Sequence, residues 1–183
     1  MFIKNVIKKM VYRLRADYTT ESLVKLGLKV GNNFLRMEGV ILDPSHCWLI
    51  EIGDNVIMAP RVHVLAHDAS TCNHLGYAKI GKVTIGDNVF IGASSVILPN
   101  VKIGANSIIG ANSTVSKDIP DNVVAAGSPA KIICTLEEYI EKNRKLMLTN
   151  PVYEEEYTLR KNVSDEKKQE QFDALQGRMG FVK

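Results

Sequence analysis

Histidine is the side chain best suited to move protons near neutral pH, and this chain contains four of them. An imidazole with an ordinary pKa near 6.5 can both accept and donate a proton at that pH. The four lie at His46, His63, His67 and His74. His67 ends the run VHVLAH and directly precedes a segment without a regular pattern, which makes it the best candidate for a general base. The expected chemistry is proton transfer assisted by an imidazole.

The cysteines form no recognisable catalytic or metal-binding pattern. Cys47, Cys72 and Cys134 lack the close paired spacing of a metal finger, and none lies in a motif that pairs a thiol with a base. We interpret them as packing residues of a reduced, cytoplasmic protein. The phosphate-binding motif GxxxxGK does not occur either, so nucleotide hydrolysis is not indicated.

A six-residue repeat must position these side chains. From Ile85 the chain divides into IGDNVF, IGASSV, ILPNVK, IGANSI, IGANST and VSKDIP, and each hexad begins with a β-branched aliphatic residue. The same phase appears from Ile52 and, more loosely, from Val30. A period of six fits neither a helix nor one alternating strand, but it fits a short strand followed by a corner. Three such sides form a triangular coil, and stacked coils form a parallel β-helix in which Ile85 lies over Ile103.

Two segments interrupt the repeat. The first, DPSHCWLIE at 43–51, shortens the spacing between Leu42 and Ile52 to ten residues. The second, STCNHLGYA at 70–78, predicts a loop that projects from one coil. Loops on a rigid repeat scaffold commonly carry binding and catalytic residues, so we expect the site near these two interruptions.

Length and composition restrict the class of protein. A chain of 183 residues with 45% hydrophobic and 23% charged residues is typical of a globular protein and too apolar for wholesale disorder. No stretch approaches the roughly 18 apolar residues of a membrane span, and the N-terminus lacks the pattern of a signal peptide. Residues 1–36 carry eight Lys and Arg against two acids, but no basic stripe with aromatics follows, so nucleic-acid binding is not indicated.

Helices are expected on both sides of the repeat. Residues 2–16 place apolar side chains on one helical face, which predicts a helix that caps the prism. A weak contact of this basic helix with an acidic membrane surface is the alternative. Thr135-Leu136-Glu137-Glu138 predicts the start of another helix. We therefore expect an N-terminal amphipathic helical cap over 1–28, a β-helix catalytic domain over 29–133, and a C-terminal helix with a charged tail over 134–183.

The hexads and the sequence TVSKDIPDNVVAAGSPAKII at 114–133 resemble the left-handed β-helix hexapeptide acyltransferases. The resemblance covers roughly residues 30–133 and is greatest to the branch that O-acetylates maltose, galactosides and polysaccharides. It implies an all-β, left-handed parallel β-helix with short flanking α-helices, and the hand of the coil rests on the resemblance alone. It further implies a homotrimer that transfers acetyl from acetyl-CoA directly to a hydroxyl of a sugar or polysaccharide precursor, with no metal.

The resemblance assigns roles to side chains around the acceptor. His67 falls where the family has its catalytic histidine, although Asp68 replaces the proline that follows there. Asp43, in VILD, matches an acidic position that binds the acceptor, and a carboxylate there could also orient a histidine. Glu38 occupies the place of an asparagine that helps relatives to hold the transition state. His46 lies about one coil before His67, so it faces the same groove or packs beside the tryptophan.

The resemblance also implies where the donor binds, in a groove between neighbouring prisms. By position it offers Phe90, Gly92, Ala93, Ala111, Lys117 and Lys131. The two alanines would contact the pantetheine arm through their backbone, and the two lysines would pair with the phosphates. Phe90 would form an aromatic wall of the groove, and a backbone amide near Gly92 and Ala93 would stabilise the oxyanion.

Two other functions stay open at this point. A zinc enzyme resembling the gamma-class carbonic anhydrases needs three imidazoles from two chains that converge on one metal, and the pair His63 and His67 has a narrower spacing than that branch. A non-catalytic β-helix scaffold would keep the prism without turnover, but the presence of His67 together with Lys117 and Lys131 favours an enzyme. The residues name neither the acceptor nor the acyl group, and they leave O- and N-acetylation both open.

Overall fold

The computed structural model describes residues 18–183, so the expected helix over 2–16 lies outside the described part of the chain. The chain divides into two compact units, Met1–Leu136 and Glu137–Lys183. We refer to the described part of the first as the β-helix unit and to the second as the C-terminal unit.

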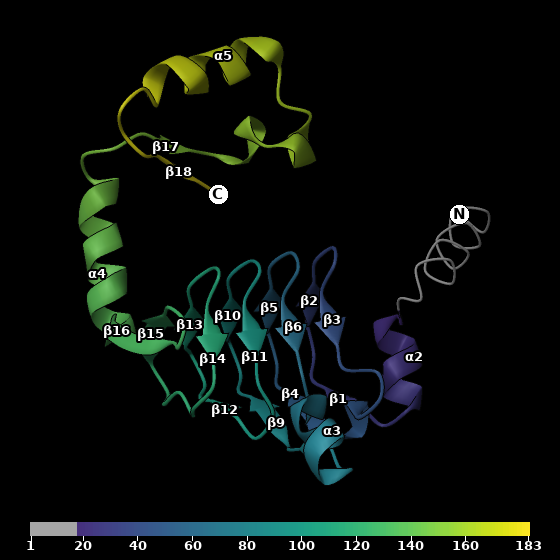
Figure 1. Ribbon diagram of the computed structural model, residues 1–183. Helices are drawn as coiled ribbons and strands as arrows, with labels where there is room; N and C mark the ends of the chain where they lie inside the picture. The colour runs from purple at the N-terminus through teal and green to yellow at the C-terminus, as the bar shows by residue number, and fades with distance from the viewer. Residues whose placement is uncertain (1–17) are drawn as a thin grey trace, which may run out of the picture. The chain divides into compact units, whose positions relative to one another are not determined.

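The β-helix unit is a stack of three-sided coils (Figure 1). Each full coil contributes one short strand to each of three sheets. The first sheet contains β1 (Lys29–Val30), β4 (Ile50–Ile52), β9 (Val83–Ile85) and β12 (Lys102–Ile103). The second contains β2 (Leu35–Arg36), β5 (Ile57–Met58), β10 (Phe90–Ile91), β13 (Ile108–Ile109), β15 (Val123–Ala126) and β16 (Lys131–Thr135). The third contains β3 (Ile41–Leu42), β6 (His63–Val64), β11 (Val96–Ile97) and β14 (Thr114–Val115).

The register confirms the six-residue repeat. Ile85 pairs with Ile103 in parallel, as the hexads predict. Within each strand the residue at the first hexad position points into the prism, where the row of aliphatic side chains is almost completely buried. Leu42 pairs with Val64 across the interruption at 43–51, which changes one corner and leaves the stacking of the coils intact. Because Leu42 and Ile52 lie on successive sides of the prism, their spacing of ten residues is longer than one hexad, and the expectation of a shortened spacing is wrong. Within these three sheets of the described chain, β16 alone runs antiparallel to its neighbour, β15, where it ends the second sheet.

Asparagine ladders hold one edge of the prism. Asn33, Asn55, Asn88, Asn106 and Asn122 all have φ between 54° and 60°, a left-handed conformation that asparagine adopts more readily than most residues. The side-chain amide of each donates a hydrogen bond to the side-chain oxygen of the next, at 3.0–3.1 Å. The asparagine that recurs in the hexads therefore turns the chain and also joins successive coils.

A short helix, α2 (Thr20–Lys25), covers the first coil. Its start is capped by Thr19, whose hydroxyl accepts a hydrogen bond from the Ser22 backbone amide at 3.2 Å. Leu23 is completely buried and belongs to the core of the prism. The helix lies inside the segment 1–28 that we expect to form a helical cap, although the amphipathic pattern itself lies at 2–16. It closes an apolar interior that would otherwise meet solvent.

The two interruptions of the repeat contain short helical turns. Residues Cys47–Leu49 form the 3-10 helix η1. The projecting loop begins with β7 (His67–Asp68), which pairs antiparallel with β8 (Lys79–Ile80) at the loop's other end. Between them lie the 3-10 helix η2 (Ala69–Thr71) and α3 (Cys72–Leu75). The predicted loop is thus confirmed, but it is a closed hairpin with helical turns and not an irregular excursion.

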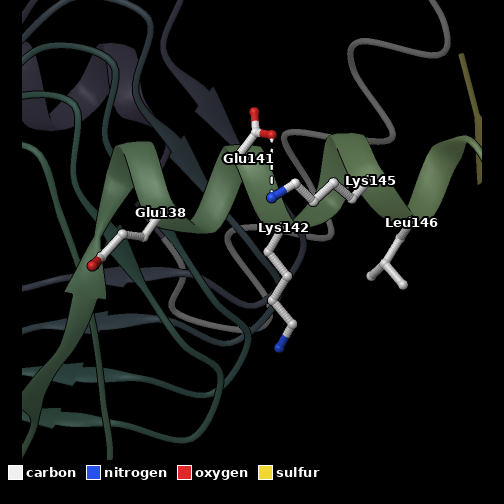
Figure 2. Close-up of a pocket in the computed structure, with 5 residues that line it drawn as sticks. All are labelled: Glu138, Glu141, Lys142, Lys145 and Leu146. Carbon is white, nitrogen blue, oxygen red and sulfur yellow. Dashed lines mark ion pairs between the residues drawn. The ribbon is translucent and has the colours of Figure 1, made fainter.

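The C-terminal unit begins within α4 (Leu136–Met147), which starts where the pattern at 135–138 predicts. It continues with β17 (Val152–Tyr153), the 3-10 helices η3 (Glu155–Tyr157) and η4 (Leu159–Lys161), α5 (Asp165–Ala174) and β18 (Phe181–Val182). The strands β17 and β18 pair in parallel. A hollow along α4 is lined by Glu138, Glu141, Lys142, Lys145 and Leu146 (Figure 2). An ion pair of 3.6 Å joins Glu141 to Lys145, and the hollow contains neither histidine nor cysteine.

Over residues 18–183, no helix has both the length and the apolar character needed to cross a membrane.

Candidate active site

The stacking of two coils brings Asp43 and His67 together. Asp43 directly follows β3, and its backbone amide donates to the Val64 carbonyl of β6 at 2.9 Å. His67 follows three residues after Val64, beyond the completely buried Ala66. Because β3 and β6 are neighbours in the third sheet, the corners that follow them stack as well, and the two side chains meet on one edge of the prism.

The Asp43 carboxylate is buried and fully hydrogen-bonded. The side chain is 1% exposed, and both of its oxygens accept hydrogen bonds. Oδ1 accepts from the Ser45 hydroxyl at 2.7 Å and from the Ser45 backbone amide at 3.1 Å. Oδ2 accepts from the Ala66 amide at 3.0 Å and lies 2.5 Å from Nδ1 of His67. Each lone-pair direction of this carboxylate therefore has a partner within the site.

Two opposed effects act on the Asp43 carboxyl. Burial alone would raise its pKa, but the hydrogen bonds from Ser45, His67 and Ala66 favour the charged form and leave the pKa lowered from its ordinary value. The group is therefore an anion near neutral pH and can only accept hydrogen bonds. It follows that Nδ1 of His67 carries a proton toward Asp43, and in the neutral imidazole Nε2 keeps its lone pair. The His67 side chain is 36% exposed, so this lone pair can meet a solute.

A second imidazole lies in the same cluster. The ring centroids of His46 and His67 are 5.4 Å apart, and Nδ1 of His46 lies 3.3 Å from the Ser45 hydroxyl. Trp48 packs against His46 with a centroid distance of 5.1 Å. His46 therefore packs beside Trp48 and also lies next to His67.

Ser45 links the cluster, and sequence reasoning missed it. Its hydroxyl touches Asp43 and lies 3.2 Å from Nδ1 of His67. The available signal was the spacing of Asp43 and Ser45, because an aspartate often accepts hydrogen bonds from the residue two positions later.

One group of described residues has metal-ligating atoms close enough to share an ion. Asp43, His46 and His67 each place such an atom within 4.8 Å of the others. His63 is not in this group, since it lies on β6 in register with Ile41 and Val96. Within this single chain, His63 and His67, the pair weighed for the zinc-enzyme alternative, therefore do not share one site. His74 lies in α3 of the loop.

The loop that follows His67 is held at its base by an ion pair. Lys79 Nζ lies 2.5 Å from Asp68 Oδ2, across the pairing of β7 and β8. The ion pair, with help from the Ser70 backbone amide, lowers the pKa of Asp68 to about 2. Asp68 thus anchors the hairpin beside His67. Tyr77, in the loop, is 79% exposed.

The expected donor residues lie elsewhere on the same chain. Phe90 is on the outer face of the second sheet and is 40% exposed. Gly92 follows β10 at the corner between the second and third sheets, and a Cβ there would approach the Ala111 amide nitrogen to 2.4 Å, which only glycine avoids. Ala93 and Ala111 share that corner, where the Ala93 carbonyl accepts from the Asn112 amide at 2.8 Å.

Within one chain this corner and the His67 edge are separated by the width of the third sheet. Glu38 precedes β3, whereas Asp43 follows it, so these two acids also lie on opposite edges. Lys117 and Lys131, both exposed, follow β14 and begin β16 in the last coils. The structure therefore gathers Asp43, His46 and His67 and does not bring Glu38 or the expected donor residues to them.

Comparison with known proteins agrees with the fold. Residues 82–117 match the family model described as bacterial transferase hexapeptide (six repeats). Protein CapG of Staphylococcus aureus is 38% identical over 143 residues, which cover 74% of this chain and 83% of that protein. Galactoside O-acetyltransferase of Escherichia coli is 44% identical over 113 residues, covering 58% of this chain and 53% of that protein.

A solved structure extends the comparison to three dimensions. The galactoside acetyltransferase in complex with coenzyme A superposes with a TM-score of 0.54 at 29% identity, over 73% of this chain and 80% of that one. The coil is therefore left-handed, as the resemblance implied and as the periodicity alone did not show. The chain belongs to the hexapeptide-repeat transferase family and is an acetyltransferase built on a left-handed parallel β-helix.

Proposed function

We propose that this protein transfers the acetyl group of acetyl-CoA to a hydroxyl of a sugar or glycan precursor, with His67 as the general base. The observation that carries the proposal is the contact of 2.5 Å between Nδ1 of His67 and the buried, ionised Asp43. It leaves Nε2 of a partly exposed imidazole free to accept a proton. The related galactoside acetyltransferase, which was solved with coenzyme A, supports the choice of donor and acceptor class.

The reaction needs one proton to move twice. Nε2 of His67 removes the proton of the acceptor hydroxyl as its oxygen attacks the acetyl carbonyl carbon. Asp43 stabilises the imidazolium that forms, because its negative charge lies next to the ring. The tetrahedral intermediate collapses by breaking the carbon–sulfur bond, and His67 returns the proton to the departing thiolate of coenzyme A. No acyl-enzyme is required, and in our proposal the three unpaired cysteines have no catalytic role.

The donor groove requires a second copy of the chain. The corner with Gly92, Ala93 and Ala111 and the edge with His67 are separated by a full side of the prism, so one chain alone does not present both to one thioester. A neighbouring prism in a homotrimer would bring its Ala93 corner against the His67 edge. There an amide near Gly92 and Ala93 would steady the oxyanion, and Phe90, Lys117 and Lys131 would hold the rest of the donor.

An apolar row on the second sheet suits such an interface. Leu35, Ile57 and Phe90 stack in register on its outer face, and all three are substantially exposed in the single chain. Exposed apolar rows of this kind commonly mark contact surfaces between proteins. Sedimentation of the purified protein tests the trimer directly.

Glu38 and His46 belong to the acceptor side of the proposal. His46 lies beside the base and would contact the acceptor, whereas Glu38, on the opposite edge of its own chain, would reach an acceptor only at the His67 edge of a neighbouring prism. A cytoplasmic location is also part of the proposal and is supported by the unpaired state of all three cysteines.

The test is acetyl-CoA consumption by the purified protein with sugars, nucleotide-sugars and amines as acceptors. Changing His67→Ala should lower turnover about a hundredfold or more, because a positioned general base contributes 10²–10⁴-fold. The matched control is His74→Ala, which removes a histidine from the adjacent loop without touching the cluster. Equal turnover of the His67→Ala variant and the unaltered protein would remove His67 as the base.

A further inference from the structure

We propose that Asp43, His46 and His67 also form a site for a divalent transition-metal ion such as Zn²⁺, and that the bound ion inhibits the enzyme. The three side chains supply two imidazoles and one carboxylate, which are ligands that zinc accepts in proteins. Three protein ligands leave one position of a tetrahedral ion open to solvent, as in many reactive zinc sites. The ion is proposed as a reversible ligand and not as a resident cofactor.

The distances fit an ion after small movements. Zinc bonds of about 2.0–2.2 Å place tetrahedral ligand atoms about 3.4 Å apart. The Asp43 and His67 atoms, at 2.5 Å, would separate by about 1 Å, as the ion replaces the proton that they share. The widest pair of ligand atoms, within 4.8 Å, would close by a little more than that. Rotation of the partly exposed His46 is sufficient for this closure, since its hydrogen bond to Ser45 is a long one of 3.3 Å.

The surroundings of the carboxylate favour a cation. Asp43 carries a negative charge in a site where it is 1% exposed, so water screens that charge little. The Ser45 and Ala66 backbone amides hold it at 3.1 Å and 3.0 Å, which orients it in the way that outer partners orient metal ligands. His67 is 36% exposed, which provides a path for the ion from solvent.

Inhibition follows from the chemistry of the imidazole, and this half of the inference rests on the proposed function. An ion bound to Nδ1 of His67 leaves the proton on Nε2, and an ion bound to Nε2 occupies the lone pair. In either case His67 no longer accepts a proton from the acceptor. The ion should therefore lower kcat without displacing acetyl-CoA.

The experiment measures binding and turnover separately, on the full-length protein without a histidine tag. Zn²⁺ binding is measured by competition with a chromogenic chelator. Co²⁺ is then added as a spectroscopic probe, because it distinguishes nitrogen and oxygen ligands from thiolates. We expect one ion per chain, no thiolate absorption band, and an affinity weakened about tenfold or more by His46→Ala. His63→Ala and His74→Ala are the matched controls and should bind as the unaltered chain does.

Each outcome decides one part of the inference. Absence of Zn²⁺ binding, a thiolate band in the Co²⁺ spectrum, or equal losses in His46→Ala and His63→Ala would overturn the site. Binding that depends on His46 without any loss of turnover would overturn the inhibition alone. Because binding is measured without acetyl-CoA, a protein that turns over but binds no ion refutes this inference and leaves the proposed function intact.

Discussion

The contact between Asp43 and His67 makes Asp43→Asn the most informative substitution. The side chain keeps its size, but it has one acceptor oxygen where the carboxylate has two. Asp43 accepts four hydrogen bonds, two on each oxygen, so the amide can satisfy only one side of the site. If the amide nitrogen faces His67, the ring must accept at Nδ1 and carry its proton on Nε2, which is the wrong tautomer for a base.

The size of the effect follows from the charge that is lost. A hydrogen bond to a charged group contributes about 1.5–3 kcal/mol, and in the proposed mechanism the charge matters most when His67 becomes an imidazolium in the transition state. A loss of about 3 kcal/mol corresponds to roughly a hundredfold in rate. Reversal of the tautomer would increase the loss toward about 10⁴-fold, as for the corresponding aspartate of serine proteases. We therefore expect kcat to fall about a hundredfold or more.

The assay follows release of the coenzyme A thiol with an acceptor from the screen, at a temperature well below unfolding. The KM for acetyl-CoA should stay unchanged, because Asp43 is buried and bonded within its own chain. Glu51→Gln is the control, since Glu51 lies on the first sheet and its carboxylate is ion-paired with Lys29 and Lys82. A kcat within about threefold of the unaltered protein would refute the orienting role. A raised KM for the acceptor at unchanged kcat would instead assign Asp43 to acceptor binding.

Three further predictions concern stability and the loop. The Lys29 and Lys82 ammonium groups hold the pKa of Glu51 below its ordinary value, so the ion pairs stabilise the fold above about pH 4.5 and cease to do so on acidification. Urea unfolding at pH 7 should therefore give Glu51→Gln a slightly smaller free energy of unfolding, by well under about 1 kcal/mol, and the difference should disappear by pH 3. Asn88→Ala should lower the stability by about 2 kcal/mol, because it removes two ladder hydrogen bonds and forces a φ of 56° on alanine. Asn88→Gly should lower it less, because glycine adopts this φ freely, and equal shifts of the melting temperature in the two variants would contradict the role of the backbone conformation. Asp68→Ala should speed proteolysis within residues 69–78, because it removes the ion pair with Lys79 at the base of the hairpin. An unchanged cleavage rate would show that the pairing of β7 and β8 alone holds the loop.

The fold could be predicted from the sequence because its rule is local and repeated. Each hexad specifies one side and one corner, and the aliphatic residue at its first position has a single way to be buried, so the register of Ile85 over Ile103 followed directly. The features that the hexads do not specify lie outside the repeat. The helix α2 lies outside the hexads, so the repeat does not specify its position. Its Leu23 is buried only because the first coil provides an apolar surface to pack against. Likewise, the closed hairpin after His67 brings together Asp68 and Lys79, which are eleven positions apart in the sequence.

The sequence by itself determined the coil and the candidate histidine, because aliphatic spacing and residue type carry that information. Only the tertiary structure decided what the histidine touches. Asp43 and His67 are 24 positions apart, and the stacking of two coils with an interrupted repeat brings them to 2.5 Å. The same stacking buries Asp43 and turns both of its oxygens toward partners on its own chain. The hydrogen-bonding geometry of a buried carboxylate depends on the neighbouring coil, and residue type alone does not specify it.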